Sequence, residues 1–267
     1  MGTPIASALT ADVATSGHHH KGWAVSVESV SKFFGNGTSA VHALEDVSLE
    51  VGMGEFVCLL GASGCGKSTL LNLIAGLDRP TQGKVEVRGG RTTLMFQDGA
   101  LFPWLSVEKN IELALKLRKV ERHLRKETLA ALLDMVNLKE FAKRHPHDLS
   151  GGMRQRVALA RALAQQAEVL LMDEPFGALD AMSRDLLHEE LEGLWQNTGF
   201  TVLFVTHNVR EAVRLGDRVI MLSSRPGRVI AEFPVEIERP RRTESVEVGK
   251  LAGSIMTRLR EEVRRHG

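Results

Sequence analysis

The spacing of apolar positions changes along the chain, and each spacing predicts a different element. Apolar and polar residues alternate at Val25 and Val27 and again over 47–51, which is typical of strands that bury one face of an antiparallel sheet. Three continuous apolar runs follow at 56–60, 169–172 and 202–206. Such runs are typical of strands covered on both faces, as in a parallel sheet. We therefore expect an α/β fold with a small antiparallel sheet and a mostly parallel one.

Helical spacing fills the intervals between these runs. Leu70, Leu73, Ile74 and Leu77 predict a helix directly after the 56–60 run. Residues 106–142 have helical spacing and no strand pattern, so we expect an inserted helical subdomain over about 104–165 of a domain that spans 23–240. A last stripe predicts a helix within 241–267, packed on that domain through Val248, Leu251, Ile255, Leu259 and Val263.

Composition narrows the possible partners. The 267 residues are 43% apolar and 25% charged, with a net charge of +1, so the chain can build a core and lacks the basic excess expected of a nucleic-acid-binding protein. We find no apolar run of about 18 residues; if a membrane matters, another chain spans it. Residues 1–22 are small and polar and predict a flexible tail. His18 to His20 lie in it, with no carboxylate or cysteine at ligand spacing.

A phosphate-binding loop follows the first buried run. Residues 61–69 match the pattern G-x-x-x-x-G-K-[ST], with a helix predicted immediately afterwards. Glycines let successive backbone N–H groups point at a phosphate, and the start of the helix adds its positive dipole end. The loop is expected to bind nucleotide through Gly61, Ala62, Ser63, Gly64, Cys65, Gly66, Lys67, Ser68 and Thr69. Lys67 would reach the β- and γ-phosphates, and Ser68 would bind Mg²⁺.

Two acidic residues end the second buried run. Asp173 and Glu174 are consecutive, so on a strand their side chains would point to opposite sides and could serve different tasks. We expect Asp173 to bind Mg²⁺ through water and Glu174 to act as the general base on the attacking water. His207 follows the third run; it would emerge at the same edge of the sheet, either as a site residue or as a structural one.

Residues 149–155 predict a second helix whose N-terminus could bind an anion. Their sequence is Leu-Ser-Gly-Gly-Met-Arg-Gln. Ser150 is a good N-cap, and Gly151 and Gly152 expose backbone N–H groups at the start of a predicted helix. This segment resembles the signature of ATP-binding-cassette (ABC) ATPases, and the resemblance extends from about 26 to 238.

The resemblance implies roles for residues that their pattern alone does not assign. It makes Gln97 a sensor of Mg²⁺ and of the attacking water, Asp180 a member of the loop called the D-loop, and His207 the switch histidine at the γ-phosphate. In this family the signature of one subunit closes over nucleotide held by the phosphate loop of the other. The resemblance therefore implies a homodimer with two composite ATP sites, closed by ATP and reopened by hydrolysis.

The adenine contact departs from the family pattern. In this family the base stacks on an aromatic residue, most often tyrosine, and the chain contains no tyrosine. Phe34 stands at the matching place and can stack on the base without a hydroxyl contact. Phe33 would then be the neighbour that faces the core, or the two could exchange roles.

Finer similarity indicates a transport system. The segments 96–104, 171–181 and 225–229 resemble the ATPase subunits of nitrate, sulfonate and taurine importers. That resemblance implies separate transmembrane permease subunits, an extracytoplasmic solute-binding protein, and a peripheral location on the cytoplasmic face of the inner membrane. An exporter subunit and a soluble ABC ATPase outside transport are the alternatives, although the long insertion or second cassette expected of the latter is absent.

An aromatic run follows Gln97, at Leu101, Phe102, Pro103 and Trp104. Such a run can belong to the core or to an interface, where Trp and Phe are enriched. We expect it to help form the groove that receives a helix of the membrane subunit.

Overall fold

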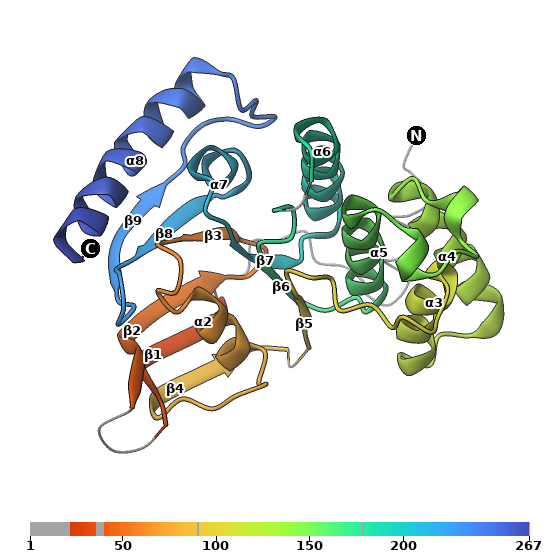
Figure 1. Ribbon diagram of the computed structural model, residues 1–267, viewed down its shortest axis with the longest axis horizontal. Helices are drawn as coiled ribbons and strands as arrows, with labels where there is room; N and C mark the ends of the chain where they lie inside the picture. The colour runs from red at the N-terminus through yellow and green to blue at the C-terminus, as the bar shows by residue number, and fades with distance from the viewer. Residues whose placement is uncertain (1–21, 36–39, 90, 178, 267) are drawn as a thin grey trace.

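The computed structural model describes residues 22–35, 40–89, 91–177 and 179–266. The tail predicted over 1–22 lies outside the described residues except for Gly22. Over the described ranges, the chain forms two sheets flanked by helices (Figure 1). None of the described helices combines the length and the apolar character needed to cross a membrane.

The N-terminal strands form an antiparallel sheet of three strands. Its members are β1 (Trp23–Phe34), β2 (Val41–Gly52) and β4 (Gln82–Val87), in the order β2-β1-β4. The alternating segments predicted as strands are the two that pair as β1 and β2. β4, which carries no buried alternation, was not predicted.

The second sheet has six strands in the order β5-β6-β7-β3-β8-β9. The three continuous apolar runs become neighbouring parallel strands at its centre: β6 (Val169–Asp173), β7 (Thr201–Val205) and β3 (Phe56–Leu60). β5 (Thr92–Met95) and β8 (Arg218–Leu222) extend it in parallel, and β9 (Val229–Pro234) closes one edge antiparallel to β8. The expectation of a mostly parallel sheet is confirmed.

Helices surround this sheet in two groups. On one side of Figure 1, α3 (Val107–Leu117), α4 (Arg122–Met135) and α5 (Gly151–Ala164) lie together. On the other side, α8 (Val246–His266) runs along β9, with α7 (Val209–Leu215) next to it. The helix α2 (Lys67–Ile74) lies beside the antiparallel sheet, and α6 (Ala181–Thr198) lies between the two groups. Two short 3-10 turns, Lys139–Phe141 and Pro146–Asp148, lead from α4 into α5.

Alternation along β3 divides the core between two clusters. Phe56, Cys58 and Leu60 pack with the helical side, whereas Val57 and Leu59 pack with β1, β2 and α2, and all five are fully buried. A strand whose two faces meet two different cores must be apolar throughout. That requirement explains the continuous run.

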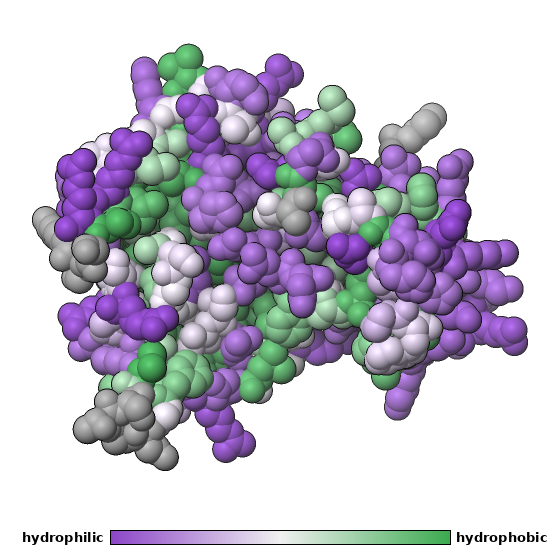
Figure 2. Space-filling model, in the orientation of Figure 1, coloured by the Kyte–Doolittle hydropathy of each residue, from purple (hydrophilic) through white to green (hydrophobic). Residues whose placement is uncertain are grey.

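The charged residues of α3 and α4 are exposed or half-buried, whereas the polar Asn110 and Thr128 are buried. In Figure 2 the surface over these helices is dominated by hydrophilic residues, while the face turned inward buries Ile111, Leu115 and Leu132. The predicted helical segment is therefore amphipathic, as its spacing required.

Two residues of the predicted helical stripes differ from the expectation: Leu77 is not helical, and Val263 is helical but not packed on the domain. Leu77 lies beyond the end of α2 and is 63% exposed, because Gly76 adopts a left-handed φ of 70° that ends the helix. Val263 continues the stripe of α8 but is 44% exposed. The helix runs past the surface that buries Val248 and Ile255 completely.

Candidate active site

The loop between β3 and α2 is shaped around its glycines. Gly66 is the N-cap of α2 with a φ of 103°, a conformation that other residues adopt only under strain. A Cβ at this position would lie 2.8 Å from the carbonyl oxygen of Ala43. The next residue, Lys67, opens the helix, so the free N–H groups of the first turn face the loop.

Lys67 closes the loop from inside. It is 6% exposed, and its Nζ donates hydrogen bonds of 2.9 Å to the carbonyl oxygens of Gly61 and Ala62. The Cys65 Sγ lies 3.8 Å from the same Nζ. Burial raises the pKa of the Cys65 thiol, although Lys67 opposes the shift. The thiol therefore stays protonated at neutral pH.

Asp173 ends β6 beside the first turn of α2. Burial raises the pKa of its carboxyl, with the charge of Glu174 adding to the effect, while a hydrogen bond from the Ser68 side chain and the charge of Lys67 lower it. Strand order explains the meeting, because only β7 separates β6 from β3. Ser68 and Asp173, far apart in sequence, are thus brought together.

Glu174 points toward the site for a reason other than the predicted one. The strand ends at Asp173, and Glu174 has a left-handed φ of 46°, so strand alternation does not set its direction. Its N–H donates to the Val205 carbonyl at 3.0 Å, which fixes the turn. Its Oε2 lies 3.0 Å from Nδ1 of His207, whose side chain is 68% exposed.

A cleft of about 590 Å³ opens at this edge of the sheet. It brings Gln97 and Asp173 together, and its lining is completed by Phe96, Asp98, Gln155 and Gly177. Gln155 is 4% exposed and its Nε2 donates to the Gln97 carbonyl at 3.4 Å. The sequence analysis placed Gln155 in the signature segment but assigned it no role. Ser150 and the two glycines explain the rest of that segment, so the remaining polar residue, Gln155, could have been recognised as a candidate for the site.

The signature segment forms as predicted but belongs to the helical side. The Ser150 hydroxyl accepts a hydrogen bond from the N–H of Met153 at 3.2 Å and caps α5. A Cβ at Gly152 would lie 2.7 Å from Leu179, so the glycine allows close contact with the segment before Asp180. Figure 1 shows α5 well separated from α2.

Asp180 has a structural task in the described chain. It is the N-cap of α6, and its carboxylate accepts from the N–H of Ser183 at 2.9 Å. Hydrogen bonds from Ser183 hold the pKa of Asp180 below its ordinary value.

Both phenylalanines of 33–34 lie at the surface. Phe34 is 42% exposed, with the Lys32 Nζ 4.9 Å from its ring centroid. Phe33 is 38% exposed and stacks on His42 at 4.0 Å. The expectation that Phe33 faces the core is wrong, because His42 of the paired strand offers it a stacking partner at the sheet surface. Phe34 keeps an accessible ring face.

The donor groups present suit Mg²⁺. The Ser68 hydroxyl, the Asp173 carboxylate and the Gln97 amide offer oxygen ligands at one edge of the sheet, and Mg²⁺ prefers a few protein oxygens completed by water and phosphate. The described residues contain no cluster of three or more His, Cys, Asp or Glu side chains that could hold a metal. A site with one carboxylate and one hydroxyl needs no such cluster.

A glycine-rich loop between β3 and α2, with an acid two strands away and a glutamate–histidine pair beside it, defines a P-loop nucleotide hydrolase. The presence of a separate signature helix narrows the class. Residues 44–177 match the family model described as ABC transporter, and the chain belongs to that family of ATPases.

Three relatives show which branch of the family is similar. The nitrate import ATP-binding protein NrtD of Synechocystis sp. is 45% identical over 79% of this chain and 82% of its own length. The aliphatic sulfonates import protein SsuB of Bacillus cereus is 42% identical over 81% and 88%. The taurine import protein TauB of Rhizobium johnstonii is 46% identical over 84% and 88%.

A solved structure agrees with the fold. The ATP-binding cassette MJ0796, a dimer in a post-hydrolysis state bound to ADP and Pi, matches 80% of this chain and 100% of its own with a TM-score of 0.74 and 34% identity. The resemblance and the fold class expected from the sequence are confirmed, as is ATP hydrolysis as the activity of the chain.

Proposed function

We propose that this ATPase powers solute import through separate transmembrane permease subunits, working as a homodimer on the cytoplasmic face of the inner membrane. The relatives named as nitrate, sulfonate and taurine import proteins support import of a small solute of that kind. An extracytoplasmic solute-binding protein would deliver the solute. The observation that carries the mechanism is the 3.0 Å contact between Glu174 and His207 beside the phosphate loop.

Each site is composed of groups from two chains. The loop 61–69 holds the phosphates, while Ser150, Gly151 and Gly152 lie at the start of α5, which Figure 1 shows apart from α2. A second copy would supply the signature N–H groups, as the resemblance to ABC ATPases implies. The dimeric cassette with ADP and Pi supports this arrangement.

The chemistry assigned to each residue follows from its position. Lys67 exchanges its bonds to the Gly61 and Ala62 carbonyls for phosphate oxygens. Ser68, Asp173 and Gln97 would hold Mg²⁺, which supplies charge neutralisation at the phosphates when bound. Glu174 orients and deprotonates the attacking water, His207 holds Glu174 and the γ-phosphate in register, and Phe34 stacks on adenine.

Glu174→Gln tests the general base. The variant should bind ATP, trap a closed dimer and lose nearly all hydrolysis, because the amide cannot accept the proton of water. Glu261→Gln, on the exposed face of α8, is the matched control and should hydrolyse ATP normally. Unchanged turnover in Glu174→Gln would refute the assignment. Lys67→Ala should instead weaken ATP binding itself.

The run after Gln97 supports a docking surface for a permease helix. Trp104 is 70% exposed and Phe102 36% exposed, with their rings 5.5 Å apart, whereas Leu101 packs against the core. Asn110 fixes the turn, accepting from the Phe102 N–H at 2.9 Å and donating to the Phe102 and Leu105 carbonyls. A rigid turn with exposed aromatic rings matches an interface centre better than a core.

Trp104→Ala separates the two roles of this run. Soluble ATPase activity and the melting temperature should be unchanged, while transport with the permease subunits should be lost. Loss of folding would show that Trp104 belongs to the core. Co-purification with permease subunits and a binding protein would distinguish an importer from an exporter.

A further inference from the structure

A buried polar network lies directly behind the Glu174–His207 pair. Glu211 of α7 is 7% exposed, His188 of α6 is 2% exposed and Arg214 of α7 is 5% exposed. The His188 Nε2 lies 2.7 Å from Oε1 of Glu211, and its Nδ1 lies 3.3 Å from Nη1 of Arg214. Arg214 continues to Asp185 at 2.8 Å.

The donors in this network can be assigned from chemistry. A guanidinium only donates, so Nδ1 of His188 must accept from Arg214. With Nδ1 accepting, Nε2 carries the proton that is donated to the Glu211 carboxylate. The second oxygen of that carboxylate accepts from the Thr206 hydroxyl. Both oxygens of Glu211 are therefore occupied by oriented donors.

Thr206 connects this network to the backbone on both sides of the switch histidine, His207. Its hydroxyl donates to Glu211 and accepts from the N–H of Asn208 at 3.0 Å, so it ties together the residues on both sides of His207. Its own N–H donates to the Leu59 carbonyl at 3.2 Å. The exposed His207 side chain is thus carried by a backbone turn that is fixed from the buried side.

His188 also touches the segment that carries Glu174. Its ring lies edge-on to Phe176, with centroids 5.3 Å apart, and Phe176 is 2% exposed. The Phe176 carbonyl accepts from the N–H of Leu179, one residue before the α6 N-cap Asp180. One buried imidazole therefore contacts the chain just after Glu174 and, through Glu211 and Thr206, the chain just before His207.

We propose that Glu211 and His188 are positioning residues for hydrolysis, which hold the backbones of Glu174 and His207 at the separation that the water attack requires. The proposal rests on the proposed roles of Glu174 and His207. A charged network in a core is weak evidence for stability, since apolar side chains of similar volume often stabilise as well or better. The network is connected to the chain beside both Glu174 and His207, and this connection gives it a role in positioning them that apolar packing would not explain.

The Thr206 hydroxyl offers the sharpest test. Thr206→Val keeps the shape but removes the donor to Glu211, whereas Thr206→Ser keeps the donor. Misplacing a catalytic group by about 1 Å costs roughly 100-fold in rate, so Thr206→Val should lower kcat by about 10- to 100-fold while Thr206→Ser stays near wild type. The ATP KM and the affinity for a fluorescent ATP analogue should stay within about twofold.

Glu211→Gln and His188→Leu should give the same kcat loss with the same unchanged KM. Glu189→Gln is the matched control, because its side chain is 72% exposed and lies 3.8 Å from Arg214; its kcat should stay within about twofold. Thermal melting identifies a variant that fails to fold, in which case the Thr206 pair decides.

The outcomes separate this proposal from the one it rests on. If Glu174→Gln abolishes hydrolysis but Thr206→Val leaves kcat unchanged, the network is structural and the positioning proposal is wrong. If Thr206→Val raises KM at unchanged kcat, it is also wrong. If Glu174→Gln leaves turnover intact, the general-base assignment itself fails.

Discussion

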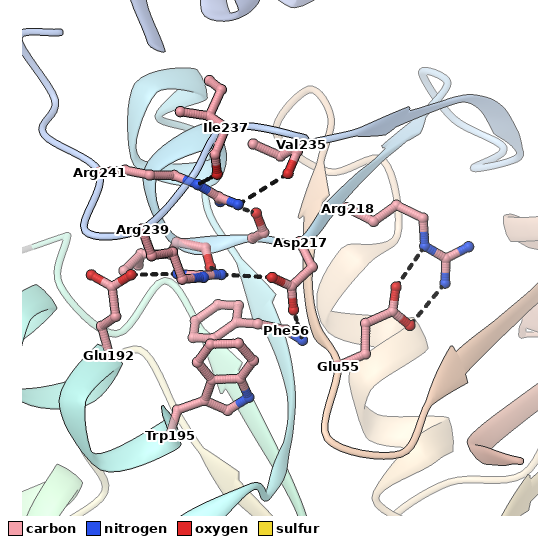
Figure 3. A network of polar contacts seen from close by, with 12 residues as sticks. Glu55, Phe56, Glu192, Trp195, Asp217, Arg218, Val235, Ile237, Arg239 and Arg241 are labelled. Carbon is pink, nitrogen blue, oxygen red and sulfur yellow. Dashed lines mark hydrogen bonds and ion pairs between the residues drawn. The ribbon is translucent and has the colours of Figure 1, made fainter. Parts of the chain in front are cut away.

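Substitution of Arg239 can measure how strongly the segment before α8 is held on the rest of the domain. Its guanidinium contacts Glu192 at 2.5 Å, Asp217 at 2.8 Å and the Leu215 carbonyl at 2.6 Å (Figure 3). It also lies 4.5 Å from the ring centroid of Trp195. Asp217 in turn accepts from the backbone N–H of Phe56 at 3.0 Å. The Arg239 side chain therefore joins α6 to Leu215 and Asp217, which lie just before β8, and Asp217 links this group to the central strand β3.

The substitution Arg239→Met should destabilise the protein by about 3–5 kcal/mol. That is the usual loss when one member of a buried ion pair is removed, because the other charge stays buried without compensation. Glu192 is the group left in that condition, since its side chain is only 8% exposed, whereas Asp217 is 36% exposed and can be hydrated. For a chain of this size the loss corresponds to a fall in melting temperature of roughly 6–20 °C.

The neighbouring Arg241 opposes a small part of this loss. Burial, followed by the charge of Arg239, lowers the pKa of Arg241 to about 10, so removal of Arg239 relieves some repulsion. Arg241 nevertheless keeps its own acceptors, the carbonyls of Ile237 at 2.7 Å and Val235 at 3.0 Å. The ion pair with Glu192 should therefore dominate the measured change.

Urea unfolding followed by circular dichroism gives the free energies. The double variant Arg239→Met/Glu192→Leu should recover at least about 2 kcal/mol relative to Arg239→Met, because the carboxylate that Arg239→Met leaves buried without a partner is removed. Arg258→Met on α8, whose partner Glu261 is 3.4 Å away at the surface, should change stability by less than about 1 kcal/mol. A single-variant loss below about 1 kcal/mol, or a double variant weaker than the single, would refute the reasoning.

Three further changes have defined outcomes. Burial raises the pKa of Glu190 from 4.5 to about 7, so the wild-type protein loses stability as the pH rises between these two values. Thermal melts should therefore show that Glu190→Gln stabilises the protein by about 1–2 kcal/mol at pH 8, a figure reduced for the partial exposure of the side chain. The same variant should show no gain at pH 4. Asp173→Asn should raise the nucleotide-free melting temperature at pH 7, because burial raises the pKa of that carboxyl, and the gain should vanish below pH 3.8. Gly66→Ala should cost about 1–3 kcal/mol by urea unfolding, whereas Gly193→Ala, with nothing within 4 Å, should not destabilise.

The parts of the molecule that sequence predicted best are those in which local pattern and chemistry coincide. The run 56–60 must be apolar because both of its faces are covered, and the loop after it must contain glycine because its backbone turns toward a phosphate. Each condition shows in consecutive residues. For the same reason the predicted N-cap Ser150 forms through a short-range hydrogen bond.

Prediction failed where a neighbour distant in sequence decides the outcome. Phe33 stacks at the surface because β2 places His42 beside it. The direction of Glu174 is set by the Val205 carbonyl on another strand. None of these partners leaves a mark in the spacing around the residue concerned.

The same distinction separates the reacting groups from the groups that hold them. Lys67, Asp173 and Glu174 lie in short motifs because phosphate, metal and water must be reached from fixed turns at one sheet edge. Their supports come from remote helices: His188 from α6, and Glu211 and Arg214 from α7. A support needs only a polar atom at the right distance, which several residue types on several elements could supply. The reacting groups of the site can therefore be predicted from the sequence, whereas the contacts that position them form only in the folded chain.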